Sequence, residues 1–235
     1  MRRSTHSVAF LLSSALLILA SCGQTQGNEQ AKTTDAQAVS MQAGQGQMLP
    51  IDTAASKILW KGSKLVGSSH EGYAPVTEGQ VTVVADALRG GKIVIDMKDL
   101  QPTDQDEESN GKLKAHLSSK DFFSVDSFPT AIFEITSVEK GAEKAANATP
   151  DSGKDAKVAG IQSNTTVTGN MTIKGIAKSI TFPAEIHADS NSVNLKAAFA
   201  IDRTNWGINY GAENSIKDKI ISKNIDFQIN IKAAK

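Results

Sequence analysis

The stretch HLSSKDFFSVDSFPTAIFEI, residues 116–135, decides the fold because it leads from a short helix through an aromatic corner into a strand. It contains four of the eight phenylalanines in the 235-residue chain. Residues 112–118 (KLKAHLS) predict about two turns of helix, with Leu113 and Leu117 four residues apart on one face. Phe128 precedes a proline, which favours extended backbone, and the run TAIFEITSV that follows alternates as a strand does.

The phenylalanines of this stretch have two interpretations. Aromatic side chains of this kind can plug one end of an all-β core. They can also form the wall of an apolar ligand cavity. The residues alone leave both interpretations open for Phe122, Phe123, Phe128 and Phe133.

Short alternating segments fill the chain on both sides of this stretch. We expect a strand from Ser56 that continues to Gly67, a polar turn at 68–72, and strands at 77–85 and 92–97 with a hairpin signal at Gly90-Gly91. Four later strands alternate strongly, and their apolar faces contain Val167, Gly169, Met171 and Ile173; Ile180, Phe182, Ala184, Ile186 and Ala188; Val193, Leu195, Ala197, Phe199 and Ile201; and Ile221, Ile225, Phe227, Ile229 and Ile231. Many short strands with one apolar face are typical of a closed antiparallel barrel or a sandwich.

Three motifs in the correct order resemble those of the YceI-like family. They are the corner HLSSKDFF with FPTAIF after it, GNMTIKGIAKSITFP at 169–183, and FAIDRTNWGI at 199–208. The resemblance extends from about Ile51 to the end of the chain. It implies an all-β fold, an extended antiparallel lipocalin-like barrel of about eight strands with one short helix, which holds a polyisoprenoid or similar long lipid in its lumen.

The N-terminal residues are expected to be a processing signal. Arg2 and Arg3 precede an apolar run at 8–20, which is too short to span a bilayer well because a spanning helix needs about 20 residues. Residues 19–22 (LASC) resemble a bacterial lipobox, so we expect a lipoprotein signal peptide at 1–21 and lipidation of Cys22. Such a protein would be secreted across the inner membrane and held in the cell envelope by its lipid anchor, facing the periplasm.

Two segments have the composition of chain outside a core. Residues 22–49 are rich in Gln, Ala, Gly and Thr and lack apolar periodicity, which predicts a lipidated flexible tether. Residues 140–160 (KGAEKAANATPDSGKDAKVAG) predict a low-complexity loop inserted between two strands. The barrel domain is therefore expected to span 50–235.

Composition excludes several functions. The precursor has 25 basic and 25 acidic residues, and loss of Arg2 and Arg3 leaves 23 basic residues, so the chain has no electrostatic footprint for nucleic acid or for an anionic membrane surface. A lipid must then be recognised by its apolar part. Cys22 is the only cysteine, which excludes an internal disulfide.

No metal, cofactor or catalytic chemistry is expected. The acids at 104–108 lack the offsets of a calcium loop and suit the N-terminus of the following helix. The chain contains no Gly-x-Ser-x-Gly, no His-Glu-x-x-His and no phosphate loop. We therefore expect non-catalytic binding of a polyisoprenoid, an isoprenoid quinone or a fatty-acid-like lipid. The alternative is a solid-cored structural or interaction module of the envelope.

Small residues on the inward faces leave room for a slender apolar guest, although they also occur where a barrel tapers. Strands of about ten residues would enclose a tunnel of roughly 30 Å. The candidate ligand-binding residues of lumen and mouth are Phe122, Phe123, Phe128, Phe133, Phe182, Ala184, Ala197, Phe199, Trp206, Arg203, His70, Tyr73 and His116.

Arg203 is the candidate contact for a phosphate or quinone oxygen, because a guanidinium makes planar bidentate contacts. Its other interpretation is an ion pair at a strand end, with Asp202 or Asp121 as partner. His70 and His116 have the alternative role of hydrogen-bonding groups in loops or caps.

Overall fold

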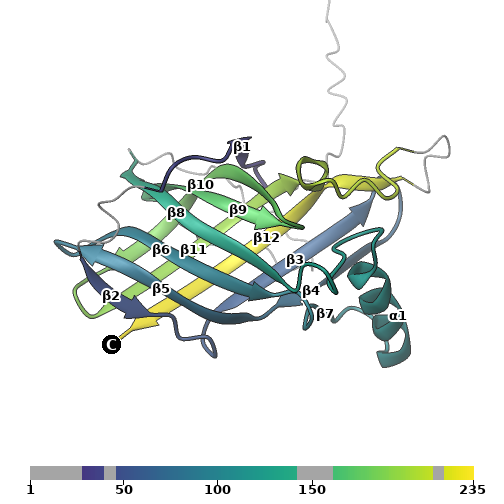
Figure 1. The fold of residues 1–235 in the computed structure, drawn as a ribbon, viewed down its shortest axis with the longest axis horizontal. Helices are drawn as coiled ribbons and strands as arrows, with labels where there is room; N and C mark the ends of the chain where they lie inside the picture. The colour runs from purple at the N-terminus through teal and green to yellow at the C-terminus, as the bar shows by residue number, and fades with distance from the viewer. Residues whose placement is uncertain (1–27, 40–45, 142–160, 214–219) are drawn as a thin grey trace, which may run out of the picture.

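The computed structural model describes residues 28–39, 46–141, 161–213 and 220–235, and these form one curled antiparallel sheet with one α-helix at its side (Figure 1). The strands are β1 (Lys32–Asp35), β2 (Gln47–Pro50), β3 (Lys57–Lys64), β4 (Ser69–Ala74), β5 (Val76–Val84), β6 (Ala87–Asp96), β7 (Gln101–Pro102), β8 (Thr130–Lys140), β9 (Thr165–Ile173), β10 (Ile176–Ala188), β11 (Ser192–Asp202) and β12 (Ile221–Ala234). The helices are α1 (Glu107–Ser118) and the 3-10 helix η2 (Arg203–Trp206). Along the sheet the order is β2-β5-β6-β8-β9-β10-β11-β12-β3-β4-β7.

The sheet closes into a barrel because one bent strand, β4 continued by β5, pairs with neighbouring strands at both edges of the sheet. β4 pairs with β3, and directly after Pro75 the chain continues as β5 and pairs with β6. Proline suits this corner because it has no N–H to leave unpaired. Ile51, just after β2, forms an isolated bridge with Ala233 of β12. With β4 and β5 counted as one bent strand, eight long strands form the wall, which confirms the predicted antiparallel barrel.

The turn between β5 and β6 lies at Ala85 and Asp86, so the prediction of a hairpin at Gly90-Gly91 is wrong. Ala85 and Asp86 have φ values of 48° and 56°, the pair of positive φ angles that a type I′ turn requires. Gly91 lies inside β6, opposite Val81. An added Cβ there would come within 2.8 Å of the Gln80 carbonyl oxygen, so the glycine permits a close approach of two strands.

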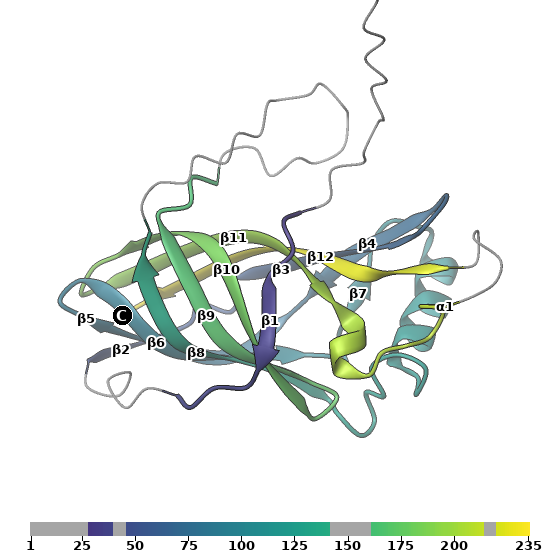
Figure 2. The same ribbon diagram turned by 90° about the horizontal axis from the view of Figure 1, so that it is seen from above.

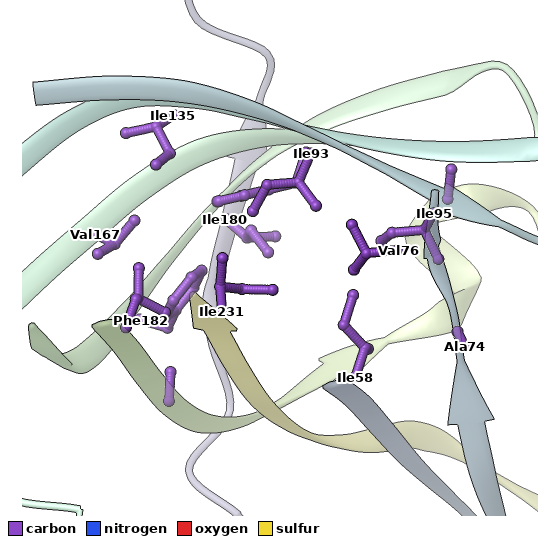
Figure 3. Close-up of a cluster of buried hydrophobic side chains, with 14 of the residues drawn as sticks. Ile58, Ala74, Val76, Ile93, Ile95, Ile135, Val167, Ile180, Phe182 and Ile231 are labelled. Atoms are coloured by element: carbon purple, nitrogen blue, oxygen red, sulfur yellow. The ribbon is translucent and has the colours of Figure 1, made fainter. Parts of the chain in front are cut away.

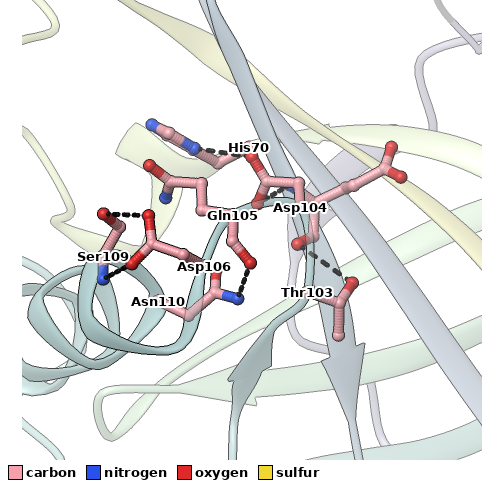
Figure 4. Close-up of polar contacts among 8 residues, drawn as sticks. His70, Thr103, Asp104, Gln105, Asp106, Ser109 and Asn110 are labelled. Carbon is pink, nitrogen blue, oxygen red and sulfur yellow. Dashed lines mark hydrogen bonds and ion pairs between the residues drawn. The ribbon is translucent and has the colours of Figure 1, made fainter.

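The helix α1 is longer than predicted and begins at Glu107. Its N-cap is Asp106, whose carboxylate accepts hydrogen bonds from the Ser109 N–H at 2.9 Å and the Ser109 hydroxyl at 2.8 Å (Figure 4). Glu107 and Glu108 occupy the first turn, where the helix dipole favours acids. The acidic run therefore starts the helix, as expected. Apolar spacing missed this start because the helix buries no residue fully.

The prediction of a flexible tether over 22–49 is wrong for the described part of that segment. β1 pairs with 178–181 of β10, and Gln30 forms a parallel bridge with Ala200 of β11. β10 and β11 pair with each other only over 184–188 and 193–197, so this segment fills the place where their pairing stops (Figure 2). Ala31 is 4% exposed and belongs to the core. The segment is therefore part of the barrel wall.

Some predicted features lie outside the described residues or at their edges. The signal peptide at 1–21 and Cys22 lie outside them. Most of the predicted loop at 140–160 does too, and the strands on either side, β8 and β9, pair antiparallel. In the ranges that the structure describes, no helix combines the length and apolar character needed to cross a bilayer.

The interior is packed with side chains at the end of the barrel away from α1. Figure 3 shows Ile135 of β8, Val167 of β9 and Ile180 of β10 reaching inward. Ile135 is 1% exposed, and Val167 and Ile180 are fully buried. The buried residues form one continuous cluster, and the fold therefore has a single core.

Candidate functional site

An apolar cavity of about 630 Å³ occupies the half of the barrel next to α1. Every long strand of the wall, from β3 to β12, contributes its inward side chains to it. The apolar lining includes Ile58, Trp60, Ala74, Ile93, Ile95, Met97, Leu100, Ala131, Phe133, Met171, Ile173, Phe182, Phe199, Ile221, Ile225, Phe227, Ile229 and Ile231. Ligand pockets are typically concave, mostly apolar and about 300–1,000 Å³ in volume. The cavity therefore has the size and lining of a site for an apolar ligand.

Four phenylalanines from four strands form a row along the cavity. The ring centroids of Phe133 and Phe182 are 5.7 Å apart, those of Phe182 and Phe199 are stacked at 4.1 Å, and those of Phe199 and Phe227 are 6.0 Å apart. Gly169 of β9 makes room for this row, because an added Cβ would come within 2.5 Å of Phe133 Cζ. Three of these phenylalanines were predicted as site residues. Phe227 was placed only on the inward face of its strand.

The barrel is packed beyond this row, so the prediction of a tunnel along its full length is wrong. Ala184 and Ala197 lie opposite each other on β10 and β11, and both are fully buried outside the cavity. Their small side chains serve close packing with Val167, Val193 and Leu195, which are also buried. The alternating pattern correctly placed both alanines inside, but it does not say which half of a strand faces empty space.

The aromatic corner lies at the mouth of the cavity. Phe122 is 8% exposed, and its ring contacts those of His116 and Tyr210 at centroid distances of 5.0 and 5.2 Å. His116 also meets Tyr210 edge to face at 4.9 Å. Phe122, Phe123 and His116 line the cavity, together with Leu113 and Leu117 of α1. The helix therefore presents its one apolar stripe to the lumen.

Phe128, by contrast, does not reach the cavity. Its ring covers Gly175 in the turn between β9 and β10, where an added Cβ would come within 2.9 Å of Phe128 Cε1. Pro129 follows Phe128 and immediately precedes β8, so the ring is held at the outside of the corner. Phe128 is thus a packing residue in this structure.

Arg203 is a buried cation at the mouth. It is 2% exposed, and its guanidinium donates to three main-chain carbonyl oxygens: Ser222 at 3.0 Å, Ile208 at 2.6 Å and Ile221 at 3.2 Å. Burial lowers the pKa of Arg203, and the charge of Asp202 partly offsets this effect. An arginine stays charged at neutral pH all the same.

The interpretation of Arg203 as part of an ion pair is wrong. Asp202 accepts from the Thr204 N–H at 2.9 Å and so begins η2, while Asp121 lies 3.6 Å from His116 Nε2. The three carbonyl contacts use three of the five guanidinium N–H groups. Arg203 also lines the cavity, so a polar atom of a guest could meet the other two.

His70 and Tyr73 both lie on β4, so the prediction of a polar turn at 68–72 is wrong for most of that segment. His70 Nδ1 is 2.9 Å from Asp104 Oδ2, a contact that links β4 to the loop before α1 (Figure 4). Burial raises the pKa of Asp104, but hydrogen bonds from His70 and the Glu71 N–H lower it, and the net pKa is below its usual value. His70 lines the cavity, whereas Tyr73 is on the outer face and 42% exposed. Strand alternation separates the two residues.

Trp206 belongs to the wall and not to the cavity. It is fully buried, and its Nε1 donates to the Met171 carbonyl oxygen at 2.9 Å, which ties η2 to β9. Residues that the sequence did not single out, such as Trp60 and Tyr210, do line the cavity. Trp60 alternates on β3 and could have been found from that pattern. Tyr210 lies after η2 in an irregular segment, where no periodicity marks it.

Within the part of the chain that the structure describes, no group of three or more His, Cys, Asp or Glu residues is arranged to hold a metal ion. The absence of a bound metal or cofactor stays a prediction. The chemistry that the lining offers is apolar contact along the cavity, together with the ionisable side chains of Lys64, His70, His116, Arg203 and Glu213.

These features define a class of protein: an antiparallel β-barrel with a half-open apolar lumen. The model of the YceI-like domain matches residues 49–233, so this chain belongs to the YceI-like family. The segment that carries β1 lies before the matched range.

Solved structures of low sequence identity share the fold. BcnA of Burkholderia cenocepacia is 20% identical, with 78% of this chain and 99% of that chain covered and a TM-score of 0.55. A polyisoprenoid-binding domain from Saccharophagus degradans, implicated in plant cell wall breakdown, is 14% identical, with 80% and 99% covered and a TM-score of 0.52. Among curated proteins, none matches this chain.

Proposed function

We propose that this protein binds one long apolar lipid in its lumen and carries out no catalytic step. The observation that carries the proposal is the cavity of about 630 Å³, whose wall is mostly aliphatic and aromatic. Its ligand is a polyisoprenoid, an isoprenoid quinone or a fatty-acid-like lipid. The alternative of a solid-cored module is not supported, because only one half of the barrel is packed.

The size of the cavity limits how much of the guest it holds. A pocket within the range of about 300–1,000 Å³ suits a drug-sized molecule, so it takes a segment of a long chain and not a tail of dozens of carbons. Each buried methylene contributes about 0.8 kcal/mol, and part of that gain is lost in ordering the chain. We therefore expect tight binding with weak selectivity for total chain length.

Family membership supports the same class of ligand. The domain from Saccharophagus degradans that shares the fold is described as polyisoprenoid-binding. Its identity of 14% makes it a guide to the class of guest and not to the particular lipid.

The mouth favours a guest with a polar head. The two guanidinium N–H groups of Arg203 that are not used by carbonyls, and the imidazoles of His70 and His116, lie at the end of the lumen where a head group would remain near water. A quinone, carboxylate or phosphate oxygen could accept from Arg203. The tail would then point toward Phe182 and Phe199.

We also propose that the protein acts in the cell envelope, held by a lipid on Cys22 and facing the periplasm. The lipobox-like residues 19–22 support this. Asn28, the first described residue, donates its N–H to Asp226 Oδ1 at 2.9 Å and is thus fixed to the wall. Five residues separate it from Cys22, and the six steps between the two Cα atoms can span at most about 20 Å. Such an anchor would hold the barrel near the membrane.

Native mass spectrometry of the full chain, purified from its own compartment, tests the lipid-binding proposal. We expect a mass increment that is lost on delipidation, and lipid extraction should identify it as a prenyl lipid or fatty acid. The delipidated protein should regain the increment when it is incubated with membranes. Protein that carries no increment and extracts no lipid from membranes would contradict the proposal.

A further inference from the structure

The loop between β3 and β4 is an apolar tip at the mouth of the lumen. Leu65 and Val66 are 60% and 57% exposed. Lys64 and Ser68 on either side of them line the cavity, so the tip continues the wall of the lumen outward. The Leu65 N–H donates to the Ile220 carbonyl oxygen at 2.8 Å, which fixes the tip beside the start of β12. Figure 2 shows the hairpin projecting at the same end of the barrel as α1.

The composition of this tip differs from that of the other described hairpin turns. The β5–β6 turn contains Ala85 and Asp86, the β9–β10 turn contains Lys174 and Gly175, and the β10–β11 turn is at 189–191 (DSN). Polar and glycine residues are usual at such places because they satisfy turn geometry in water. Two large aliphatic side chains exposed side by side at a tip have no such role. Adjacent exposed apolar side chains are a feature that contact sites for apolar partners share.

Tyr210 extends the apolar rim on the neighbouring segment. It is 45% exposed, and its ring packs on His116 and Phe122 at the mouth. The Ile221 N–H donates to the Gly211 carbonyl oxygen at 2.8 Å, so the segment of Tyr210 adjoins the same part of β12 as the tip. Tyrosine is favoured at a membrane–water boundary, where its ring and its hydroxyl meet different media.

We propose that Leu65 and Val66 insert into the surface of a lipid bilayer, so that the guest passes directly between bilayer and lumen. The inference rests on the proposed lipid-binding function and adds the partner at which exchange occurs. A long lipid crosses water slowly because its whole apolar surface is exposed there, and an apolar tip that continues the lumen wall shortens that exposure. Leu65 and Val66 carry no charge, so their contact with the bilayer depends on apolar area.

Transfer of a fluorescent fatty acid tests the proposal. The full-length protein is loaded with an anthroyloxy-labelled stearic acid and mixed in a stopped-flow instrument with phosphatidylcholine vesicles that contain a quencher. The test variant is the double substitution Leu65→Ser and Val66→Ser. The matched control is Met48→Ser, because Met48 is 59% exposed on β2 at the opposite end of the barrel (Figure 1).

For the wild type we expect a transfer rate that rises in proportion to vesicle concentration. The double variant should transfer at least about tenfold more slowly with an unchanged equilibrium affinity for the probe, because less apolar area enters the bilayer. Met48→Ser should behave as the wild type, and addition of phosphatidylglycerol should change the rate less than about twofold.

Equal rates for the wild type and the double variant, or a rate independent of vesicle concentration, would overturn the inference. So would a wild-type dimer that the double substitution dissociates, since the tip would then be an interface between two copies. If the wild type takes up no probe, the proposed function fails. Co-sedimentation of the protein with the same vesicles then tests separately whether the tip binds the bilayer. Sedimentation lost in the double variant and kept in Met48→Ser would support it, and no sedimentation of the wild type would overturn it.

Discussion

Single residues decide where the barrel is hollow and where it is filled. At Gly169 the absence of a side chain lets the ring of Phe133 lie against β9, because an added Cβ would stand 2.5 Å from Phe133 Cζ. We expect Gly169→Ala to push this ring out of the row and lower the free energy of unfolding by about 1–3 kcal/mol. Urea denaturation measures the change. The control is Gly62→Ala on β3, where an added Cβ meets nothing within 4 Å, and its effect should stay within about 0.5 kcal/mol. Similar losses in both variants would contradict the argument.

Arg203 holds the mouth together through main-chain carbonyls. Arg203→Met would leave the carbonyl oxygens of Ser222, Ile208 and Ile221 without this donor, and each buried group left unpaired costs about 1–3 kcal/mol. Because these losses are not additive, we expect a loss of roughly 3 kcal/mol in the free energy of unfolding by urea denaturation. Arg203→Lys keeps the charge but lacks the planar fork, and it should recover only part of this loss. Full recovery of stability by lysine would show that the positive charge, and not the planar guanidinium, stabilises the mouth.

Among the elements, the N-terminal strand β1 is one that local sequence did not predict. β1 and the residues before it fill the place between β10 and β11, with Ala31 buried among core side chains. We expect Ala31→Asp to lower the free energy of unfolding by at least about 2 kcal/mol, because it buries a charge. It should also speed hydrogen exchange at the Ala200 N–H, which donates to the Glu29 carbonyl oxygen at 2.9 Å. Ala36→Asp is the control, because Ala36 is exposed just after β1. Equal effects of the two substitutions would show that the strand is not part of the wall.

The docking of α1 should depend on acid pH through Asp104. The pKa of Asp104 is below the ordinary 3.8 in the folded protein, so the carboxylate stabilises the fold above that pH and loses this effect as pH falls through the folded value. We expect Asp104→Asn to lower the melting temperature at pH 7. The difference from wild type should shrink as pH falls below 3.8. Asp126→Asn is the control, because Asp126 is exposed within the aromatic corner between Phe123 and Phe128. A difference that stays constant down to pH 2 would contradict this role of the charge.

The elements that the sequence predicted well are those whose signal is local. Alternation along β9 to β12 placed Phe182, Phe199 and Ala197 inside, and the acids at 104–108 marked the start of α1. The elements that it missed depend on distant partners. β1 has no apolar periodicity, and it is ordered by the free edge of β10, which lies more than a hundred residues away along the chain. The sequence of β4 resembles a polar turn because its inward-facing residues include only small ones at the end of the strand, Gly72 and Ala74, and these give no apolar alternation.

At the scale of the whole molecule, the barrel divides stability and binding between its two halves. The row of phenylalanines separates a half filled by side chains from a half that holds the cavity. A solid half can supply a cooperative core, so the other half can remain hollow without loss of the fold. Alternation along a strand is the same in both halves. For this reason Ala131 and Ala197 look alike in the sequence, although one lines the cavity and the other is packed.

A pair of alanine substitutions tests this division. Ala131→Trp should fill the cavity, remove the co-purified lipid seen by mass spectrometry, and change the free energy of unfolding of delipidated protein by less than about 1 kcal/mol. Ala197→Trp should instead overpack the solid half and lower this free energy by about 1–3 kcal/mol or more. Lipid should raise the melting temperature of the wild type and not of Ala131→Trp, because a ligand stabilises only the state that binds it. If both substitutions destabilise the protein equally and the wild type gains nothing from lipid, the half next to α1 is closed in solution and the carrier hypothesis fails.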